Sequence, residues 1–259
     1  MPSVLAIAAH PDDIEFGMCG TMLQLKQRGW DLHYMNVADG SRGSTKLSPK
    51  ECAAKRLEEG REAASRMGAT FYPPVGRDME MAYTTELFQK VAAVVRQSRA
   101  SIVLTHSPQD YMEDHEFVCR LAVSAAFAHG MPNFETIPPV EPYYEPVTVY
   151  HAQPVGNRLP LGQRVRPHFW VDIEAVMDGK REALEAHESQ REWLDASQGM
   201  DSYIQTMIDM SADCGQMSGK FQMAEGWRRR EHWGFCNADD DPLREALSDI
   251  LVEDTPRDP

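Results

Sequence analysis

The chain begins with a short apolar segment that is followed at once by a cluster of polar side chains. Residues 4–9 read VLAIAA, a continuous apolar run typical of a strand buried on both faces of a parallel sheet. His10, Asp12 and Asp13 come directly after it. In open α/β sheets, ligands bind at the carboxyl ends of the strands. This segment therefore predicts an α/β fold with a candidate site at one edge of its sheet.

The next 120 residues alternate between strand-like and helix-like segments. Ser48, Pro49 and Glu51 form a capping box with proline at the first helical position, which predicts a helix that starts here and ends at Gly68. The alternation predicts a Rossmann-like, doubly wound, mostly parallel sheet with helices on both faces. Strands are expected at 32–37, 70–72 and 101–105, and helices at 17–28, 49–67, 85–98 and 114–129.

The organisation changes after residue 131. Eight of the 17 prolines lie in residues 132–168, which predicts a surface excursion interrupted by a strand at 147–152. A strand at 169–173 and a helix at 174–196 are expected to follow. We predict a single domain over residues 1–236 and a solvated acidic C-terminal tail over 237–259.

Charge and cysteine content limit the partners and the compartment. The chain of 259 residues has 26 basic and 40 acidic side chains, a net charge of −14 that repels nucleic acid and anionic membranes. No apolar run approaches the roughly 18–20 residues that span a bilayer, and the N-terminus does not resemble a secretory signal. Five cysteines without a CxxC pair favour a reducing cytoplasm. The Met- and Trp-rich final third is typical of packing or of an interface in a homo-oligomer.

A second polar cluster follows the strand expected at 101–105. It runs from His106 to His115 and includes Asp114. Because these two strands are neighbours at the switch point of a doubly wound sheet, both clusters are expected to face one crevice. Two histidines and one carboxylate, with positions left open for water and substrate, are typical of catalytic zinc. The alternative is that the first cluster is a turn whose aspartates only cap the following helix.

Here the sequence resembles the LmbE-like (PIG-L) family of zinc-dependent N-acetylglucosaminyl de-N-acetylases. The resemblance extends over most of the chain, because five motifs occur in the family's order. They are AHPDD at residues 9–13, Arg56-x-x-Glu59 with Ala63 and Met67-Gly68, Asp114-His115, Lys180-x-x-Ala183-Leu184-x-x-His187-x-Ser189-Gln190, and Ala224-Glu225-Gly226-Trp227-Arg228.

The resemblance implies a role for each residue of the two polar clusters. His10, Asp13 and His115 would bind the metal, and Asp12 would be the general base that deprotonates a zinc-bound water. Asp114 would accept a hydrogen bond from an imidazole and orient it. Two histidines and one aspartate also accept Fe²⁺ or Co²⁺ in place of Zn²⁺.

One position departs from the family pattern. The family often has HPDH, in which the first histidine stabilises the oxyanion, whereas this chain has Met112 at that position. A thioether is not a hydrogen-bond donor, and losing one such donor typically costs about 2.7–4 kcal/mol of barrier. His106, His151 and His187 are candidates to replace it, and we favour His187 as a catalytic residue because it lies in a family-like motif.

Two arginines are candidates for binding substrate. On its predicted helix, Arg56 would ordinarily be a solvated residue paired with Glu59, but the family pattern places it in the pocket, where its guanidinium would bind hydroxyls or a phosphate. Arg42 lies in a glycine-containing loop after the strand at 32–37 and is a comparable candidate.

The resemblance implies a hydrolase that removes an N-acetyl or other N-acyl group from an N-acetylglucosamine-type sugar or glycoside. Its partner would be a small-molecule amino sugar. Three alternatives remain: an amidase on a sugar–thiol conjugate, an ester hydrolase on the same scaffold, and a non-catalytic metal- or sugar-binding module, which the replacement at Met112 makes worth testing.

Overall fold

A computed structural model describes residues 1–190 and 203–254 of the chain. Within these ranges, eight strands form one sheet in the order β3-β2-β1-β4-β5-β7-β6-β8. The first five strands of that order pair in parallel, and the last three pair antiparallel with their neighbours. The strands are β1 Ser3–Ala8, β2 Asp31–Asn36, β3 Thr70–Tyr72, β4 Ile102–Thr105, β5 Thr148–Ala152, β6 Phe169–Asp172, β7 Ala224–Arg229 and β8 Leu251–Glu253.

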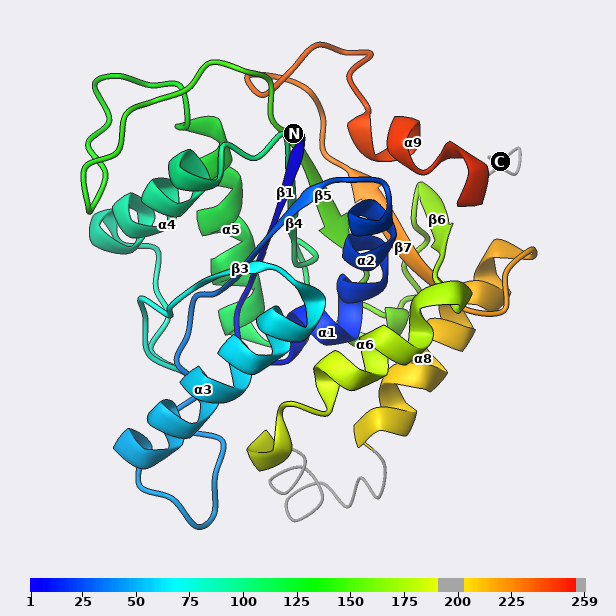
Figure 1. Cartoon of the computed structure of the whole chain (residues 1–259), viewed down its shortest axis with the longest axis horizontal. Coiled ribbons are helices and arrows are strands. Elements are labelled where there is room, and N and C mark those ends of the chain that lie inside the picture. Colours follow the sequence, from blue (N-terminus) through cyan, green and yellow to red (C-terminus); the bar gives the residue numbers. More distant parts are fainter. Residues whose placement is uncertain (191–202, 255–259) are drawn as a thin grey trace.

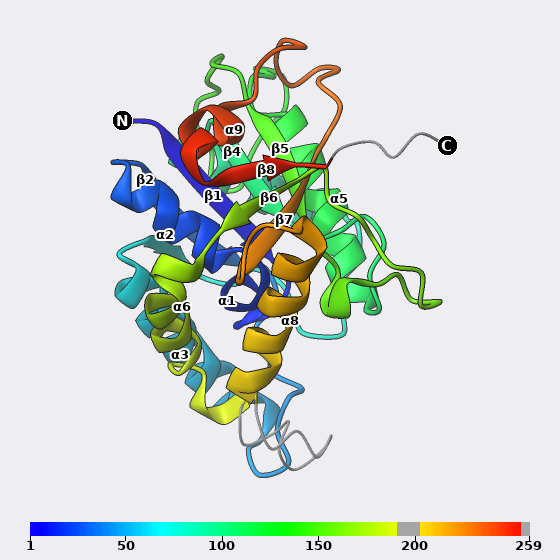
Figure 2. The same cartoon turned by 90° about the vertical axis from the view of Figure 1, so that its right-hand side faces the viewer.

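Helices cover both faces of this sheet (Figures 1 and 2). The helices and 3₁₀ turns of the described residues are α1 Asp13–Gly17, α2 Cys19–Gln27, α3 Pro49–Met67, α4 Thr85–Ser98, α5 Glu113–Phe127, η1 Val155–Asn157, η2 Glu174–Val176, α6 Met177–Leu184, α8 Tyr203–Ser218, α9 Pro242–Ala246 and η3 Ser248–Ile250. Alternate residues of β1 enter different cores: Val4 and Ala6 pack with α2 and α3, and Leu5 packs with α4 and α5. This confirms the α/β fold with helices on both faces.

Local sequence signals account for the boundaries of α3. The Ser48 side chain accepts a hydrogen bond from the Glu51 backbone, and the Glu51 carboxylate accepts one from the Ser48 backbone, so the predicted capping box is present. Gly68 ends the helix in the left-handed conformation, with φ 64°, which glycine adopts without the steric cost that other residues have.

Two predicted helices have different boundaries in the structure. The helix expected at 17–28 begins earlier, as α1 at Asp13, and breaks at Met18 before α2. The early start follows from Asp12 and Asp13, because acidic residues stabilise the first turn of a helix. The helix expected at 174–196 consists of η2 and then α6, which ends at Leu184, and its residues beyond 190 lie outside the described part of the chain.

The acidic C-terminal segment is not a solvated tail as far as residue 254. Leu243 and Leu247 are fully buried in the core that also contains β1, and β8 pairs antiparallel with β6. Tyr150 donates a 2.6 Å hydrogen bond to Asp241, which caps α9. The count of acidic residues hides this pattern, because two leucines four residues apart lie on one face of a helix whatever the charge of the others.

One guanidinium ties the segment that leads into the proline-rich excursion to the excursion itself. Arg96, in α4, donates hydrogen bonds to the backbone carbonyls of Ala128, His129, Met131 and Val140. Five N–H donors in a fixed plane suit this arrangement, because a loop without regular structure leaves its carbonyls unpaired. The predicted strand within the excursion is present as β5.

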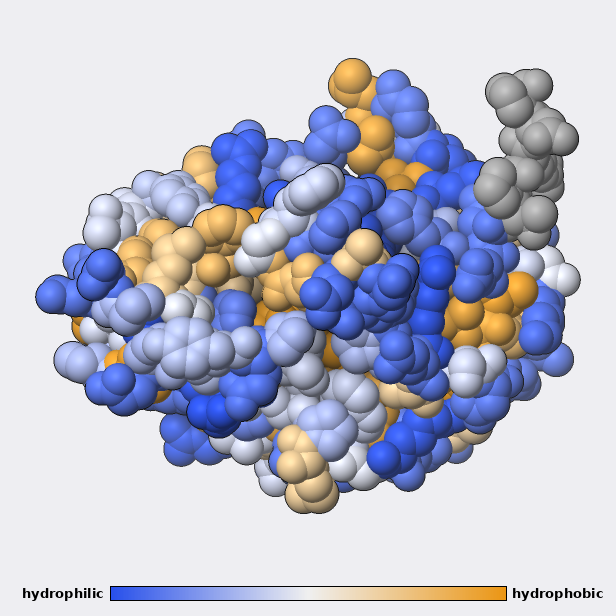
Figure 3. Space-filling view, turned by 90° about the horizontal axis from the view of Figure 1, so that it is seen from above, coloured by the Kyte–Doolittle hydropathy of each residue, from blue (hydrophilic) through white to orange (hydrophobic). Residues whose placement is uncertain are grey.

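The face of the molecule shown in Figure 3 is mainly hydrophilic. Figure 3 shows the end of the molecule at which the N-terminus lies, where hydrophilic side chains predominate and hydrophobic ones are scattered in patches. No helix of the described residues is long and apolar enough to cross a membrane.

Candidate metal centre and active site

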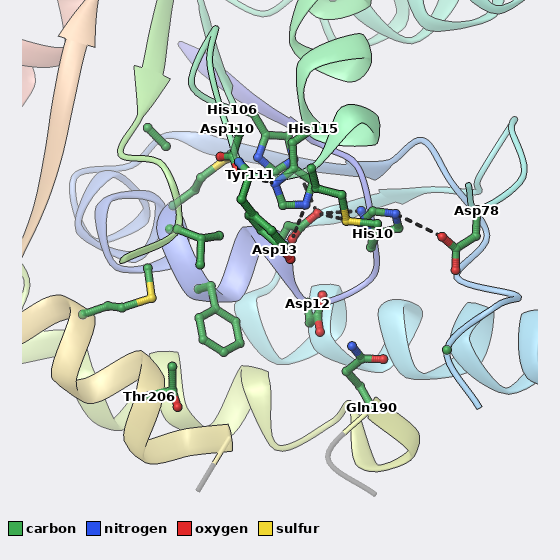
Figure 4. Close-up of a pocket in the computed structure, with 18 of the residues that line it drawn as sticks. His10, Asp12, Asp13, Asp78, His106, Asp110, Tyr111, His115, Gln190 and Thr206 are labelled. Atoms are coloured by element: carbon green, nitrogen blue, oxygen red, sulfur yellow. Dashed lines mark hydrogen bonds and ion pairs between the residues drawn. The ribbon is translucent and has the colours of Figure 1, made fainter. Parts of the chain in front are cut away.

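The two polar clusters meet at the carboxyl ends of β1 and β4. Asp13 Oδ1 lies 3.3 Å from Nε2 of His115, and Asp13 Oδ2 lies 3.5 Å from Nδ1 of His10. His10 follows β1, Asp13 begins α1, and His115 lies in the first turn of α5. Figure 4 shows the three side chains converging from these separate elements. One donor atom from each lies within 4.8 Å of the others, so the group can hold a metal ion.

The second nitrogen of each imidazole faces a carboxylate. Nε2 of His10 lies 3.1 Å from Asp114 Oδ2 and 3.2 Å from Asp78 Oδ1. Nδ1 of His115 lies 3.1 Å from Asp110 Oδ1. A carboxylate that accepts from one ring nitrogen keeps the proton there and leaves the lone pair of the other nitrogen for a metal. In the neutral form that a metal requires, each ring would therefore present a lone pair on the side of Asp13.

The charges of this cluster fit a cation. Burial opposes protonation of His10, but its hydrogen bonds to Asp114, Asp13 and Asp78 raise its pKa well above 6.5. Burial also opposes protonation of His115, but the charge of Asp13 and the contact with Asp110 raise its pKa to about 9. Imidazoles that retain protons at neutral pH balance the carboxylates around them, and a divalent ion would supply the same charge. The residues present therefore fit a divalent metal.

His106 lies against the cluster and is held by the backbone. Its Nε2 accepts a 2.8 Å hydrogen bond from the Ala9 amide, so that lone pair is already used. Its ring stacks on His115, with centroids 4.1 Å apart and planes 13° apart. Burial and the charge of His115 lower the pKa of His106. His106 therefore fixes the position of β1 and His115 and remains neutral.

Asp12 stands apart from the metal-binding group, although it is adjacent in sequence. It has φ 121° and ψ −26°, a left-handed conformation that is strained for a residue with a Cβ. The Tyr203 hydroxyl donates a 2.7 Å hydrogen bond to Asp12 Oδ2, and Arg56 Nη2 lies 3.8 Å from the same oxygen. Burial raises the pKa of Asp12 to about 6, against the charge of Arg56. A buried carboxylate with this pKa can accept a proton at neutral pH.

The two predicted substrate-binding arginines both line the pocket but differ in environment. Arg56 is buried and donates to the Pro11 carbonyl and to Gln190, so it holds the turn that carries Asp12. Arg42 is half exposed, pairs with Glu80, and its backbone amide donates to Asp78. Arg42 is therefore the arginine that can swing toward a substrate, whereas Arg56 is already bonded to the protein.

His187 lies outside the pocket lining. Its side chain is fully buried, and its Nε2 is 3.5 Å from Glu15 Oε1. The sequence pattern did not reveal this, because a motif does not show which way a side chain points, and His187 lies beyond the end of α6 at Leu184. A catalytic role for His187 stays a prediction, because its side chain is not among the described residues that line this pocket. His151, a second candidate, is also buried away from the lining and lies 2.9 Å from the His106 carbonyl.

The late motifs hold the helices together. Lys180 and Glu225 form a fully buried 2.6 Å ion pair. The same carboxylate accepts from the backbone amides of Gly20 and Thr21 in the first turn of α2, where the helix dipole favours negative charge. These contacts give a structural reason for the pattern around Lys180 and Glu225.

Three residues of the site were missed by sequence reasoning. Asp110 belongs to the second polar run and could have been selected as a partner of His115. Asp78 follows no predicted strand and reaches the site because Ala38 pairs with Gly76 in an isolated bridge. Tyr203 lies in a methionine-rich helix, and no local pattern distinguishes it there.

The site opens into a cavity of about 560 Å³. Its lining divides into a polar wall and an apolar wall. The polar wall is His10, Asp12, Asp13, Arg42, Arg56, Asp78, Asp110, His115 and Gln190. The apolar wall is Phe16, Met18, Met112, Ala152, Val155 and Met210, and the lining also contains Met79, His106, Tyr111, Gln153, Tyr203 and Thr206.

An α/β sheet that carries a two-histidine, one-carboxylate group beside a buried carboxylate is typical of metal-dependent enzymes. Comparison with known proteins identifies the family within that class. The family model "PIG-L: GlcNAc-PI de-N-acetylase" matches residues 5–126. The chain is 32% identical over 235 residues to the diacetylchitobiose deacetylase of Thermococcus kodakarensis, covering 87% of this chain and 82% of that protein. The chain belongs to the PIG-L family of de-N-acetylases, as the sequence resemblance implied.

Solved structures show the same fold. The N,N'-diacetylchitobiose deacetylase of Pyrococcus horikoshii superposes with a TM-score of 0.74 at 25% identity, covering 93% of this chain and 88% of that one. GalB, the 4-carboxy-2-hydroxymuconate hydratase of Pseudomonas putida KT2440, superposes with a TM-score of 0.75 at 21% identity, covering 93% and 99%. The similarity to the hydratase concerns the fold alone.

Proposed function

We propose that this enzyme removes the N-acetyl group from an N-acetylglucosamine-type sugar or glycoside, with Zn²⁺ held by His10, Asp13 and His115. The observation that carries the proposal is the presence of a cation-binding group and a separate buried carboxylate, Asp12, in one pocket. Deacetylase relatives that act on such sugars support the substrate class. When bound, zinc supplies Lewis-acid chemistry, which activates water near neutral pH and polarises the acetyl carbonyl.

Asp12 is the proton acceptor in this proposal. A bond forms between the water oxygen and the acetyl carbon, the carbon–nitrogen bond breaks, and the products are acetate and a free amine. Asp12 takes the proton of the attacking water and returns it to the departing nitrogen. Arg56 holds the turn on which Asp12 lies, and Tyr203 orients the carboxylate through its hydrogen bond. Asp114, Asp78 and Asp110 orient the two imidazoles.

Tyr111 is our candidate for the donor that is missing at Met112. It lines the pocket next to Met112, and its ring meets His115 edge-on, with centroids 5.4 Å apart. Tyr111 leaves 64% of its surface exposed, but its partial desolvation in the pocket and the charges of Asp13 and Asp12 raise its pKa, so its hydroxyl retains the proton that it would donate to an oxyanion. We expect Tyr111→Phe to lower kcat by about 10²–10³, the usual effect of removing one such donor.

The decisive experiment measures metal content and acetate release on the same purified protein. We expect about one zinc per chain and release of acetate from N-acetylglucosamine or its methyl glycoside. Asp12→Asn is expected to retain the metal and to lose kcat by about 10²–10⁴. Full activity of this variant would exclude Asp12 as the base. Bound metal without turnover on amide, ester or sugar–thiol substrates would instead favour the binding module.

Fe²⁺ or Co²⁺ remain alternatives for the metal. Location in the cytoplasm and assembly into a homo-oligomer also stay predictions. Each has a direct measurement: metal analysis of protein purified without added metal, cell fractionation, and light scattering.

A further inference from the structure

One wall of the pocket is apolar, although the chemistry proposed for it concerns a polar sugar. Phe16, Met112, Val155 and Met210 all line the cavity and are all incompletely buried. They come from α1, the turn before α5, η1 and α8, so four separate segments bring apolar side chains to one space. Val155 alone leaves 43% of its surface exposed. Removing apolar surface from water is favourable, so a ligand that covers these side chains would gain binding free energy.

The apolar wall is attached rigidly to the reacting groups. Tyr203, Thr206 and Met210 lie at positions i, i+3 and i+7 of α8, so they share one face of the helix, and all three line the pocket. The ring of Phe16 packs edge-on against Tyr203, with centroids 5.2 Å apart. Because the Tyr203 hydroxyl donates a hydrogen bond to Asp12, helix α8 connects the apolar wall with the proposed base. Figure 4 shows Thr206 and Asp78 on opposite sides of Asp12.

Met112 continues this wall to the metal centre. Its carbonyl accepts a 3.1 Å hydrogen bond from the His115 amide, so the residue begins the helix that carries a proposed ligand. Its thioether lines the same cavity as the side chains of Phe16 and Met210. Because Met112 stands where the family often has a histidine, an apolar side chain replaces a polar hydrogen-bond donor at this position.

The cavity has room for more than one sugar ring. Its volume of about 560 Å³ lies within the range of roughly 300–1,000 Å³ found for pockets that enclose drug-sized ligands. Sugar hydroxyls placed against the apolar wall would lose hydrogen bonds to water without replacement. The polar wall suits the amide and the sugar, and the apolar wall needs a different group.

We propose that the apolar wall binds an alkyl or aryl substituent of the substrate, so that the preferred substrates are amphiphilic N-acyl amino sugars. This inference rests on the proposed de-N-acylase function and specifies its substrate class. The substituent can be the aglycone of a glycoside or an N-acyl chain longer than acetyl. Either substituent would place an apolar group against Phe16, Met112, Val155 and Met210.

Two homologous series test the inference and separate the two sources. In one, the N-acetyl group is kept and the glycoside is lengthened from methyl to hexyl. In the other, free glucosamine carries N-acyl chains from acetyl to hexanoyl. We expect kcat/KM to rise by about two- to fourfold per methylene in one series. Equal values along both series, with acetate still released from N-acetylglucosamine, would overturn the inference and leave the proposed function intact.

A matched pair of variants on α8 locates the effect. Met210→Gln places a polar side chain of similar length in the apolar wall, and we expect it to reduce the ratio of kcat/KM between the hexyl and methyl substrates by about tenfold. Met217→Gln is the control, because Met217 lies on the same helix, is likewise partly exposed, and packs instead near Trp170. An unchanged ratio in Met210→Gln, or an equal loss in both variants, would contradict the assignment.

A binding measurement keeps the inference independent of turnover. Titration calorimetry with hexyl and methyl glucoside, which carry no amide, compares affinity alone. We expect the hexyl compound to bind wild-type protein at least tenfold more tightly, with a negative heat-capacity change. If no substrate is hydrolysed but this difference is found, the proposed function fails and the apolar site remains. If the two compounds bind equally, the apolar site is refuted.

Discussion

The two walls of the pocket are built in different ways. The polar wall includes residues that follow β1 and β4, and three carboxylates lie within 3.2 Å of its two metal-facing imidazoles. The apolar wall comes from α1, η1, α8 and the turn before α5, and it is held by packing. Groups that react need directional contacts, because a displacement of about 1 Å is costly in catalysis. Groups that select a substituent need only shape and apolar surface, so their identity can vary more freely.

The largest difference between the walls should appear when a ligand is removed. We expect His115→Ala to abolish metal binding and to lower turnover by at least about 10⁴-fold, because the reaction loses its Lewis acid. Metal analysis and acetate release measure the two effects. His33→Ala is the control, because His33 is partly exposed on β2 and contacts Tyr72 instead of the cluster. Retention of a full equivalent of metal in His115→Ala would exclude this ligand set.

A smaller effect is expected when an orienting carboxylate is neutralised. Asp114→Asn keeps the size of the side chain but weakens its hold on Nε2 of His10, which lies 3.1 Å away. We expect metal affinity to fall by about 10–100-fold. Competition with a chelator of known affinity measures the change. An affinity equal to that of the wild type would show that Asp78 alone orients His10.

The pH dependence of metal binding tests the charge balance of the polar wall. In the metal-free protein the pKa of His115 is raised to about 9, mainly by Asp13 and Asp110 against the effect of burial. The metal needs the neutral imidazole, so below pH 9 it must displace a proton. Apparent affinity should therefore fall by about tenfold for each pH unit below 9, and more steeply where His10 is protonated as well. A flat profile between pH 6 and 8.5 would contradict these protonation states.

The smallest effect is expected at the junction of the two walls. Tyr203→Phe keeps the ring packed on Phe16 but removes the hydrogen bond to Asp12. That bond favours the ionised carboxylate, so its loss should raise the pKa of Asp12 above about 6. The base is active above its pKa, and activity is lost as the pH falls through it. We expect kcat to fall by about three- to tenfold at pH 6 and little at pH 8, with unchanged metal content.

An equal loss at both pH values would contradict the role assigned to Tyr203, because it would indicate a structural defect in place of a change in protonation. Thermal unfolding of the variant separates these two outcomes. A structural defect would lower the unfolding temperature, whereas a change in protonation alone would leave it close to that of the wild type.

Much of the site could be predicted from local sequence. His10, Asp12, Asp13 and His115 each follow a strand that the apolar pattern reveals, and the topology of a parallel sheet brings the ends of neighbouring strands together. The ends of α3 were also predictable, because a capping box and a left-handed glycine depend on nearby residues alone. Asp110 was within reach of the same reasoning.

The rest depended on contacts between distant segments. His187 and Tyr203 both lie near Asp12 in the fold, yet of these two only Tyr203 forms a hydrogen bond with it, and no local sequence pattern reveals this difference. Arg56 was expected to be either solvated or in the pocket. It lines the pocket and donates to the Pro11 carbonyl in the turn that carries Asp12, and its contact with a substrate stays a prediction. The C-terminal acidic residues concealed two buried leucines and a strand that completes the sheet.

The sequence by itself determined the class of fold and the family and predicted the candidate metal-binding group, because each rests on residues close together or on the ends of recognisable strands. Only the tertiary structure decided the partners of those residues: the carboxylates that orient the imidazoles, the tyrosine on the base, and the apolar wall that includes Met112. The physical reason is that hydrogen bonding and packing depend on distance and direction in space. The Tyr203 hydroxyl lies 2.7 Å from Asp12 Oδ2, although the two residues are 191 positions apart in the chain.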